Sequence, residues 1–284
     1  YGVPQWVFGL ATYAFLDDGR VASVVTRDGE QSLELLGQDG TREPVEVPFP
    51  VFGVRGAPQL RSDGGSLLFV ASGPATPSQL VRWTVDGEYS VLRESSAVDL
   101  DAAYTSTPEH RTVPTRDGAE THAFVYPPTN PDANPSSEED PPLIVFVHGG
   151  PTSATTPAFD LSKQFFTSRG FVVADVNYRG STGYGRAYRD ALDGEWGVVD
   201  VQDCLDVARH LAETGQVDGD RMAIRGGSAG GFATLAALAF HDDLAAGTSY
   251  FGVADLTRLA ELTHKFDSRY LDTLVGPYPE VKAA

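Results

Sequence analysis

The stretch RGGSAGG, residues Arg225–Gly231, decides the fold predicted for this chain. A short β-type run, Arg221–Ile224, precedes it, and an alanine-rich stretch, Phe232–Phe240, follows it. Gly-x-Ser-x-Gly between a strand and a helix is typical of a tight turn that holds its serine in a strained conformation. We therefore predict a strand, a sharp turn that carries Ser228, and a helix behind that serine.

The glycines on either side of Ser228 are expected to be a steric requirement of this turn. Side chains at Gly226 and Gly230 would clash with the neighbouring strand and helix. The N-terminus of the helix behind Ser228 favours negative charge that develops on a bound substrate. We expect Ser228 to be a catalytic nucleophile, because the strand–helix context disfavours the alternative, an ordinary glycine-rich turn.

A second motif, His148-Gly149-Gly150-Pro151, directly follows the apolar run Leu143–Val147. In hydrolases with such an elbow, the loop after that strand supplies one backbone donor to the oxyanion hole, and the residue after the serine supplies the other. The amides of Gly150 and Ala229 are therefore the expected donor pair. His148 precedes the loop, and we expect it to organise the loop by hydrogen bonds rather than to act as a base.

From about residue 108 onward, predicted strands alternate with predicted helices. The strands are short, continuous apolar runs, as expected of a parallel sheet buried on both faces; they are Leu143–Val147, Phe171–Val176, Met222–Ile224 and Thr248–Val253. The predicted helices are Leu161–Ser168, Val198–Thr214 and Gly230–Phe240. This alternation predicts an α/β fold with a doubly wound, mostly parallel sheet.

Residues 1 to about 100 are instead predicted to form antiparallel β-structure. Six apolar runs are predicted as strands: Tyr13–Leu16, Val21–Thr26, Ser32–Leu36, Leu67–Ala71, Leu80–Val85 and Tyr89–Leu92. Asp-Gly pairs lie between several of these runs. This dipeptide favours a type I′ hairpin turn, which needs positive φ at both central residues.

The Asp-Gly turns also reveal a repeat. Asp18-Gly19 recurs 45 residues later as Asp63-Gly64, and Asp39-Gly40 recurs as Asp86-Gly87. A period of ~40–45 residues with several strands is typical of propeller blades, and a closed propeller needs ~4–8 blades. We therefore expect the last two blades of a longer β-propeller; a small β-sandwich with accidental similarity is the alternative.

Three motifs in this order, His148–Pro151, NYRGSTGYGR at Asn177–Arg186 and Gly226–Gly231, resemble the prolyl oligopeptidase family of serine peptidases. The branch is similar to the acylaminoacyl-peptidases and dipeptidyl aminopeptidases. The resemblance covers essentially the whole chain and is specific only as a combination. It implies C-terminal propeller blades over residues 1–103 and an α/β-hydrolase catalytic domain over residues 104–284.

The resemblance also implies roles for individual residues. Ser228 is expected to be acylated by short peptide substrates, with Gly150 and Ala229 as oxyanion donors. The loop Asn177–Arg186 is expected to line the pocket wall. The pocket candidates are Tyr178, Arg179, Tyr184 and Gly227, although Arg179 and Arg186 have a structural alternative as ion-pair partners.

The sequence departs from the family in its catalytic triad, which in α/β-hydrolases runs in the order Ser, acid, His. Only His241 and His264 follow Ser228. We expect His241 at the far end of the elbow helix, roughly 20 Å away, and His264 in a helix-rich excursion before the later strands. The triad Asp and His are therefore expected beyond Ala284, and further propeller blades are expected before Tyr1.

Composition excludes several kinds of partner. The net charge of −18 argues against nucleic acid and anionic membranes, which require a basic surface. No run of ~18 apolar residues indicates a membrane span. The single cysteine, Cys204, favours a packed thiol and a cytoplasmic location.

No cofactor or metal is expected. Asp200, Asp203 and Asp206 follow one another at helical spacing, but without clustered histidines they are expected to be a solvated helix face rather than a metal site.

Two other functions remain open beside a peptidase. A carboxylesterase of the same fold is disfavoured by the proline that ends His148–Pro151, where many esterases have glycine, and by the expected propeller. A catalytically incomplete fragment or binding module is the other alternative. Besides a short peptide substrate, the partners expected for the chain are further copies of itself or the remainder of its own polypeptide.

Overall fold

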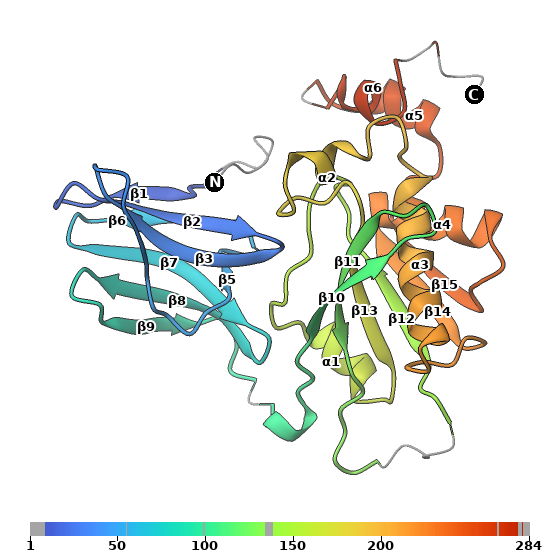
Figure 1. Cartoon of the computed structure of the whole chain (residues 1–284), viewed down its shortest axis with the longest axis horizontal. Coiled ribbons are helices and arrows are strands. Elements are labelled where there is room, and N and C mark those ends of the chain that lie inside the picture. Colours follow the sequence, from blue (N-terminus) through green and yellow to red (C-terminus); the bar gives the residue numbers. More distant parts are fainter. Residues whose placement is uncertain are drawn as a thin grey trace. The chain divides into compact units, whose positions relative to one another are not determined.

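The computed structural model describes residues 9–54, 56–98, 100–133, 139–265, 267–277 and 280. The chain divides into two compact units (Figure 1). The first comprises residues 1–107 and 155–164, and the second comprises residues 108–154 and 165–284. Each unit has its own sheets and its own apolar core.

The first unit contains two antiparallel sheets. One has the order β1-β2-β3-β4, formed by β1 (Tyr13–Phe15), β2 (Val21–Arg27), β3 (Glu30–Leu36) and β4 (Arg42–Pro44). The other has the order β5-β7-β8-β9 with β6 also paired to β7, formed by β5 (Val51–Phe52), β6 (Arg61–Ser62), β7 (Ser66–Gly73), β8 (Thr76–Thr84) and β9 (Tyr89–Glu94). All six predicted strands are present, whereas β4, β5 and β6 are too short to show an alternating pattern in the sequence.

The two sheets share one apolar core. Leu33 from the first sheet and Leu67, Phe69 and Trp83 from the second belong to the same buried cluster. Residues 20–50 and 65–95 therefore do not pair into one continuous sheet, although their side chains pack together.

The hairpin turns differ in part from the type I′ prediction. In the four predicted turns only the glycines have positive φ, with values of 85° at Gly19, 86° at Gly40, 92° at Gly64 and 88° at Gly87. Positive φ at both residues occurs instead at Asp28-Gly29, which joins β2 to β3 in a two-residue loop. A type I turn followed by one left-handed glycine explains the other four, because that turn also suits Asp-Gly.

The second unit is built on a six-stranded mixed sheet with the order β10-β11-β13-β12-β14-β15. Its strands are β10 (Glu109–Pro114), β11 (Glu120–Tyr126), β12 (Leu143–Val147), β13 (Val172–Asn177), β14 (Met222–Gly227) and β15 (Ala246–Tyr250). The hairpin β10-β11 is antiparallel and joins β13 antiparallel, and β13, β12, β14 and β15 are mutually parallel. The predicted α/β class is confirmed, and β12 and β13 are buried as predicted. The strand predicted at Thr248–Val253 is β15, which is largely exposed because it lies at the edge of the sheet.

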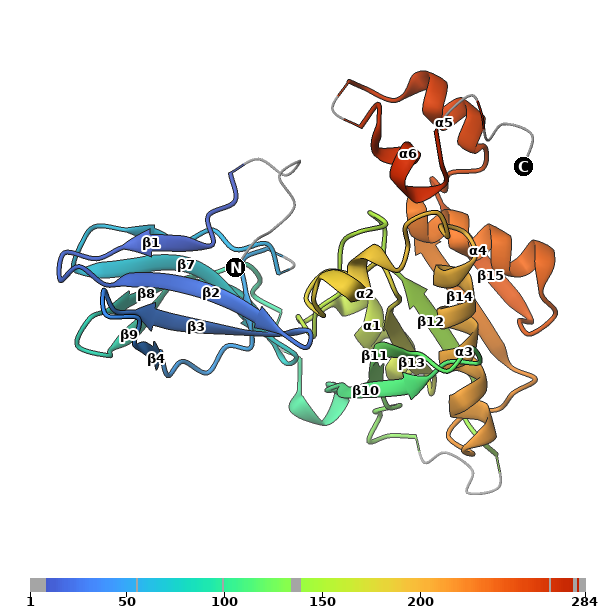
Figure 2. The same ribbon diagram turned by 45° about the horizontal axis from the view of Figure 1, so that its top comes forward.

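Helices α3 (Val199–Glu213) and α4 (Ala229–Phe240) lie side by side on one face of this sheet (Figures 1 and 2). Their apolar side chains and the inward residues of the strands form the largest core. The other helices are α1 (Leu161–Thr167), α2 (Arg186–Asp190), α5 (Leu256–Leu262), α6 (Tyr270–Leu274) and the 3₁₀ turn η1 (Ala102–Tyr104). Among the described helices, none has the length and apolar character needed to cross a membrane.

The acidic residues of α3 contradict the prediction of a solvated face. Asp200, Asp203 and Asp206 are 1%, 0% and 7% exposed. The charges of Asp203 and Asp206 are met inside the fold, because Arg179 pairs with Asp203 and Arg116 pairs with Asp206. Helical spacing alone could not show this, since both arginines come from outside α3.

Candidate active site

Ser228 lies at the junction between β14 and α4, where the sequence predicts an elbow. Its backbone has φ of 55° and ψ of −119°, a strained conformation for a residue other than glycine. Its amide donates to the Tyr250 carbonyl at 3.1 Å, and its carbonyl accepts from the Phe232 amide at 3.0 Å. The side chain is exposed and makes no capping hydrogen bond to the helix. The hydroxyl is therefore presented to the outside by a rigid turn.

The two glycines that flank the elbow are required by close packing, as predicted. A Cβ on Gly226 would lie 2.3 Å from the Gly230 carbonyl oxygen. A Cβ on Gly230 would lie 2.2 Å from the carbonyl oxygen of Val147, at the end of β12. Any side chain at either position would push helix and strand apart, so the sharp turn depends on both glycines.

The loop after β12 lies directly against the serine. A Cβ on Gly149 would lie 3.4 Å from the Ser228 Cβ and 4.0 Å from the Ala229 nitrogen. Gly150 is exposed and has φ of 134°, which favours glycine. The two predicted donor segments thus border the same serine, and the Ala229 amide is at the start of α4, where the helix dipole favours negative charge.

Both ring nitrogens of His148 make hydrogen bonds, one within the loop and one to Ser181. Nδ1 is 2.8 Å from the Gly149 carbonyl oxygen, and Nε2 is 2.8 Å from the Ser181 hydroxyl. Burial lowers the pKa of His148, so the ring is neutral near pH 7. These hydrogen bonds support the prediction that His148 organises the loop, and that it does not serve as a base stays a prediction.

Tyr178 lies inside the fold, which corrects the expectation that it lines a pocket. The residue is 1% exposed, and its ring stacks on the His148 ring with centroids 4.3 Å apart. Its hydroxyl contacts the carbonyl oxygens of His148 at 3.1 Å and Pro151 at 3.0 Å. Burial raises the pKa of Tyr178 well above its ordinary value, so the hydroxyl keeps its proton and acts as a donor.

Arg179 also has internal partners, as its structural alternative predicts. The guanidinium binds Asp203 through Nε and Nη2 and binds Asp117 through Nη1 at 2.7 Å. The Arg179 side chain is largely buried, so a substrate contact would require this cluster to open. Hydrogen bonds from the Thr115 hydroxyl and then from Arg179 lower the pKa of Asp117 to about 2.

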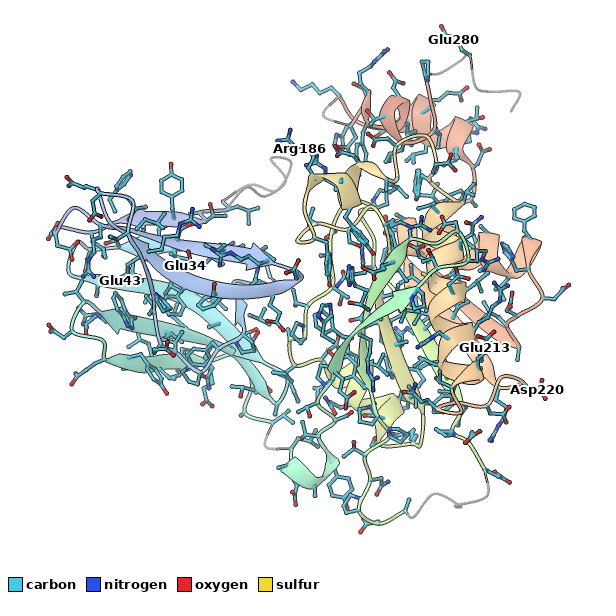
Figure 3. The ribbon with its side chains drawn as sticks, in the orientation of Figure 1. Glu34, Glu43, Arg186, Glu213, Asp220 and Glu280 are labelled. Atoms are coloured by element: carbon cyan, nitrogen blue, oxygen red, sulfur yellow. The ribbon has the colours of Figure 1, made fainter. Side chains whose placement is uncertain are left out.

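The other two pocket candidates lie on different parts of the second unit. The half-buried Tyr184 ring stacks on His122 with centroids 4.1 Å apart, and its hydroxyl accepts from Asn177 Nδ2 at 3.1 Å. Gly227 precedes Ser228 and lies beneath the Phe251 ring, which would be 3.1 Å from a Cβ at that position. Arg186 is exposed at the start of α2 (Figure 3).

Two contacts of the loop after β12 were not predicted. The Tyr270 hydroxyl, from α6, lies 2.6 Å from the Thr152 hydroxyl, across 118 residues of sequence. The Ser181 hydroxyl contacts His148 across 33 residues. Ser181 lies in the motif Asn177–Arg186, so the sequence offered a signal for it, whereas nothing in the local sequence singles out Tyr270.

The histidines after the elbow lie where the sequence predicts them. His241 is the residue that ends α4, at the opposite end of that helix from Ser228. His264 is largely exposed, and its Nε2 lies 3.2 Å from an Asp267 carboxylate oxygen. Within the described residues, the Ser228 hydroxyl makes no hydrogen bond, and no group of three or more His, Cys, Asp or Glu side chains is arranged to hold a metal ion.

Residues 157–282 match the prolyl oligopeptidase family. The chain is 32% identical over 165 residues to dipeptidyl aminopeptidase BIII of Pseudoxanthomonas mexicana, which covers 57% of this chain and 24% of that protein. It is 42% identical over 93 residues to the acylamino-acid-releasing enzyme of Arabidopsis thaliana, and this match covers 33% of this chain and 12% of that enzyme. The likeness of residues 157–282 is thus to the prolyl oligopeptidase family, and these relatives are named as peptidases.

Solved structures of this family extend the likeness over nearly the whole chain. A puromycin-hydrolysing peptidase of Mycobacterium tuberculosis superposes with a TM-score of 0.93 at 44% identity, covering 97% of this chain and 42% of that one. The acylaminoacyl peptidase of Pyrococcus horikoshii superposes with a TM-score of 0.78 at 25% identity. This match covers 95% of this chain and 42% of the peptidase. The chain thus spans less than half the length of these relatives.

Proposed function

We propose that this chain is part of a serine peptidase of the prolyl oligopeptidase family, which cleaves short peptides through an acyl-enzyme on Ser228. The observation that carries the proposal is the strained, exposed Ser228 between β14 and α4, bordered by the glycine loop after β12. A nucleophile held in this way needs no backbone rearrangement to meet a substrate carbonyl.

The chemistry assigned to the site is acyl transfer. The Ser228 oxygen attacks the peptide carbonyl carbon, its proton passes to a base, and the carbonyl oxygen becomes an oxyanion between the amides of Gly150 and Ala229. The C–N bond then breaks as the leaving amine takes up the proton, which leaves an ester on Ser228 that water hydrolyses. Loss of one oxyanion donor commonly costs ~3–4 kcal/mol of transition-state stabilisation.

The base in this proposal is an imidazole contributed by the rest of the protein. A serine hydroxyl is a weak nucleophile unless an imidazole accepts its proton at ~2.6–3.2 Å. His148 is unsuited, because its Nε2 is engaged with Ser181, and His241 lies across the length of α4. A carboxylate from the same remainder would orient that imidazole, in keeping with the order Ser, acid, His.

We assign the described strands of residues 1–103 to the last blades of a β-propeller and residues 104–284 to the hydrolase domain. Two separate antiparallel sheets support the blade assignment, whereas the apolar core that they share also fits the alternative of a small β-sandwich. A propeller ahead of the hydrolase would restrict entry to short peptides.

The names of the relatives suggest three amide substrates to test. The relatives are called dipeptidyl aminopeptidases, acylamino-acid-releasing enzymes and puromycin hydrolases. We propose that the complete protein cleaves an amide bond next to a short aminoacyl or acyl-aminoacyl group. A puromycin-hydrolysing peptidase is 44% identical to this chain, which makes puromycin the first of the three to try.

The decisive experiment compares the turnover of an amide with that of an ester that carries the same acyl group. The full-length protein should turn over aminoacyl anilides and puromycin, and Ser228→Ala should abolish both activities. A nitrophenyl acyl ester that is cleaved while every peptide anilide is left intact would favour the carboxylesterase alternative. If neither substrate class is cleaved by the full-length protein, the proposed function fails.

A further inference from the structure

The Ser181 hydroxyl, the His148 ring and the Gly149 carbonyl oxygen are linked by two hydrogen bonds. This chain ends on the peptide whose N–H is the proposed oxyanion donor. This peptide joins Gly149 to Gly150. Its carbonyl oxygen belongs to Gly149, and its N–H belongs to Gly150. Because a peptide unit is planar, fixing the direction of the carbonyl also fixes the direction of the N–H, which points the opposite way.

The His148 ring fixes that carbonyl. A carbonyl oxygen can only accept, so the 2.8 Å contact to Nδ1 requires the hydrogen to be on Nδ1. Burial keeps the ring neutral, so Nε2 then has a lone pair and must accept. The partner of Nε2 is the Ser181 hydroxyl at 2.8 Å, which is the donor this tautomer needs.

The surroundings hold both members of this chain in place. Ser181 is 0% exposed, and its amide donates to the Tyr178 carbonyl at 2.9 Å. The Tyr178 ring stacks on His148 at an interplanar angle of 15°. The neighbouring Thr182 amide donates to the Ser153 carbonyl at 2.8 Å, which joins the Ser181 segment to the far end of the same loop.

We propose that Ser181 is a positioning residue of the oxyanion hole: its hydroxyl selects the His148 tautomer that orients the Gly149–Gly150 peptide and its N–H. The inference rests on the proposed function, in which the Gly150 amide stabilises the oxyanion. Ser181 does not touch the substrate. It acts through His148, so its removal should affect the transition state more than the bound substrate.

The first test is kinetic and uses the full-length protein with a peptide anilide. Ser181→Ala should lower kcat by about 10-fold to 100-fold with little change in KM, because the oxyanion exists only after attack. Tyr188→Phe is the matched control, since it also deletes a hydroxyl that contacts a carbonyl oxygen, that of Asn177 at 2.6 Å. The control should keep the wild-type kcat even if both variants lose similar stability.

A double-mutant cycle separates positioning from general destabilisation. In His148→Asn, the side-chain amide nitrogen takes the place of Nδ1 and donates without needing a partner at Nε2. Adding Ser181→Ala to His148→Asn should then change kcat less than about 2-fold, against about 10-fold or more in the wild-type background. Equal losses in both backgrounds would overturn the proposal.

A spectroscopic readout tests the tautomer itself. Long-range ¹H–¹⁵N spectra of histidine-labelled protein should show a neutral His148 with the hydrogen on Nδ1, and Ser181→Ala should shift the ring toward the other tautomer or a mixture. A wild-type ring with its hydrogen on Nε2 would contradict the inference. The proposed function is tested separately, because it fails if the wild-type protein cleaves no peptide anilide, whichever tautomer His148 adopts.

Discussion

The two loops that border Ser228 are fixed by different physical means. The elbow after β14 is held by sterics, because Gly226 and Gly230 leave no room for a side chain beside the neighbouring backbone. The loop His148–Pro151 after β12 is held instead by side-chain hydrogen bonds from Ser181, Tyr178 and, next to the loop, Tyr270. A site can therefore combine one part that depends on short-range packing with another that depends on distant residues.

The largest effect on stability is expected from a side chain placed in the elbow after β14. In Gly230→Ala, the new Cβ would meet the Val147 carbonyl oxygen at 2.2 Å, and backbone cannot move aside as a flexible side chain can. We expect destabilisation of about 3 kcal/mol or more and loss of soluble, folded protein. Thermal unfolding should be compared with Gly215→Ala, a position where a Cβ meets nothing within 4 Å, although its φ of 68° carries a strain of its own. Equal unfolding temperatures in the two variants would contradict steric control of the elbow.

A second large effect is expected at the buried ion pair between Arg179 and Asp203. Asp203→Asn removes the charge that faces Arg179, and Asp203 is 0% exposed. Removing one partner of a buried pair typically costs about 3–5 kcal/mol, and we expect the lower end of this range because Arg179 keeps its contact with Asp117. Denaturant unfolding measures this loss, and Asp190→Asn, at an exposed pair with Arg189, is the control with an expected change below about 1 kcal/mol. Similar losses in both variants would show that the buried pair is not special.

The third prediction concerns pH and the buried Asp200. Burial raises the pKa of Asp200 from 3.8 to about 7, and its Oδ2 has no hydrogen-bond partner in the described part of the chain. The folded state therefore binds this proton more tightly than the unfolded chain, so stability falls as pH rises from 3.8 to about 7. Asp200→Asn should remove this fall and gain about 2 kcal/mol relative to wild type between pH 5 and pH 8. Parallel stability curves for the two proteins would refute the assignment.

The smallest effect sharpens the contrast between the loops. Tyr178→Phe keeps the ring that stacks on His148 and removes only the hydroxyl that contacts the carbonyls of His148 and Pro151. We expect a loss of about 1–2 kcal/mol in stability and a modest fall in kcat with KM retained. The unfolding free energy and the kcat of a peptide anilide are the measurements. An unchanged kcat would mean that the loop holds its shape without this bond.

The same contrast explains what the sequence could and could not predict. The elbow, its glycines and the strands β12 and β14 follow from local patterns, because their causes lie within a few residues. The burial of Asp203 does not, since its partner Arg179 is 24 residues away, and Asp117 joins Arg179 from a distance of 62 residues. Arg179 was for the same reason a pocket candidate, as its position in a glycine-rich loop does not show its partners.

The most direct test of the account is the site of labelling by a fluorophosphonate in the full-length protein. The account predicts one modified peptide, carrying the adduct on Ser228, and no labelling of Ser228→Ala. Tyr188→Phe should be labelled at the wild-type rate, because it leaves both loops intact. Labelling that persists in Ser228→Ala, or an adduct mapped to another serine, would contradict the assignment of Ser228 as the nucleophile.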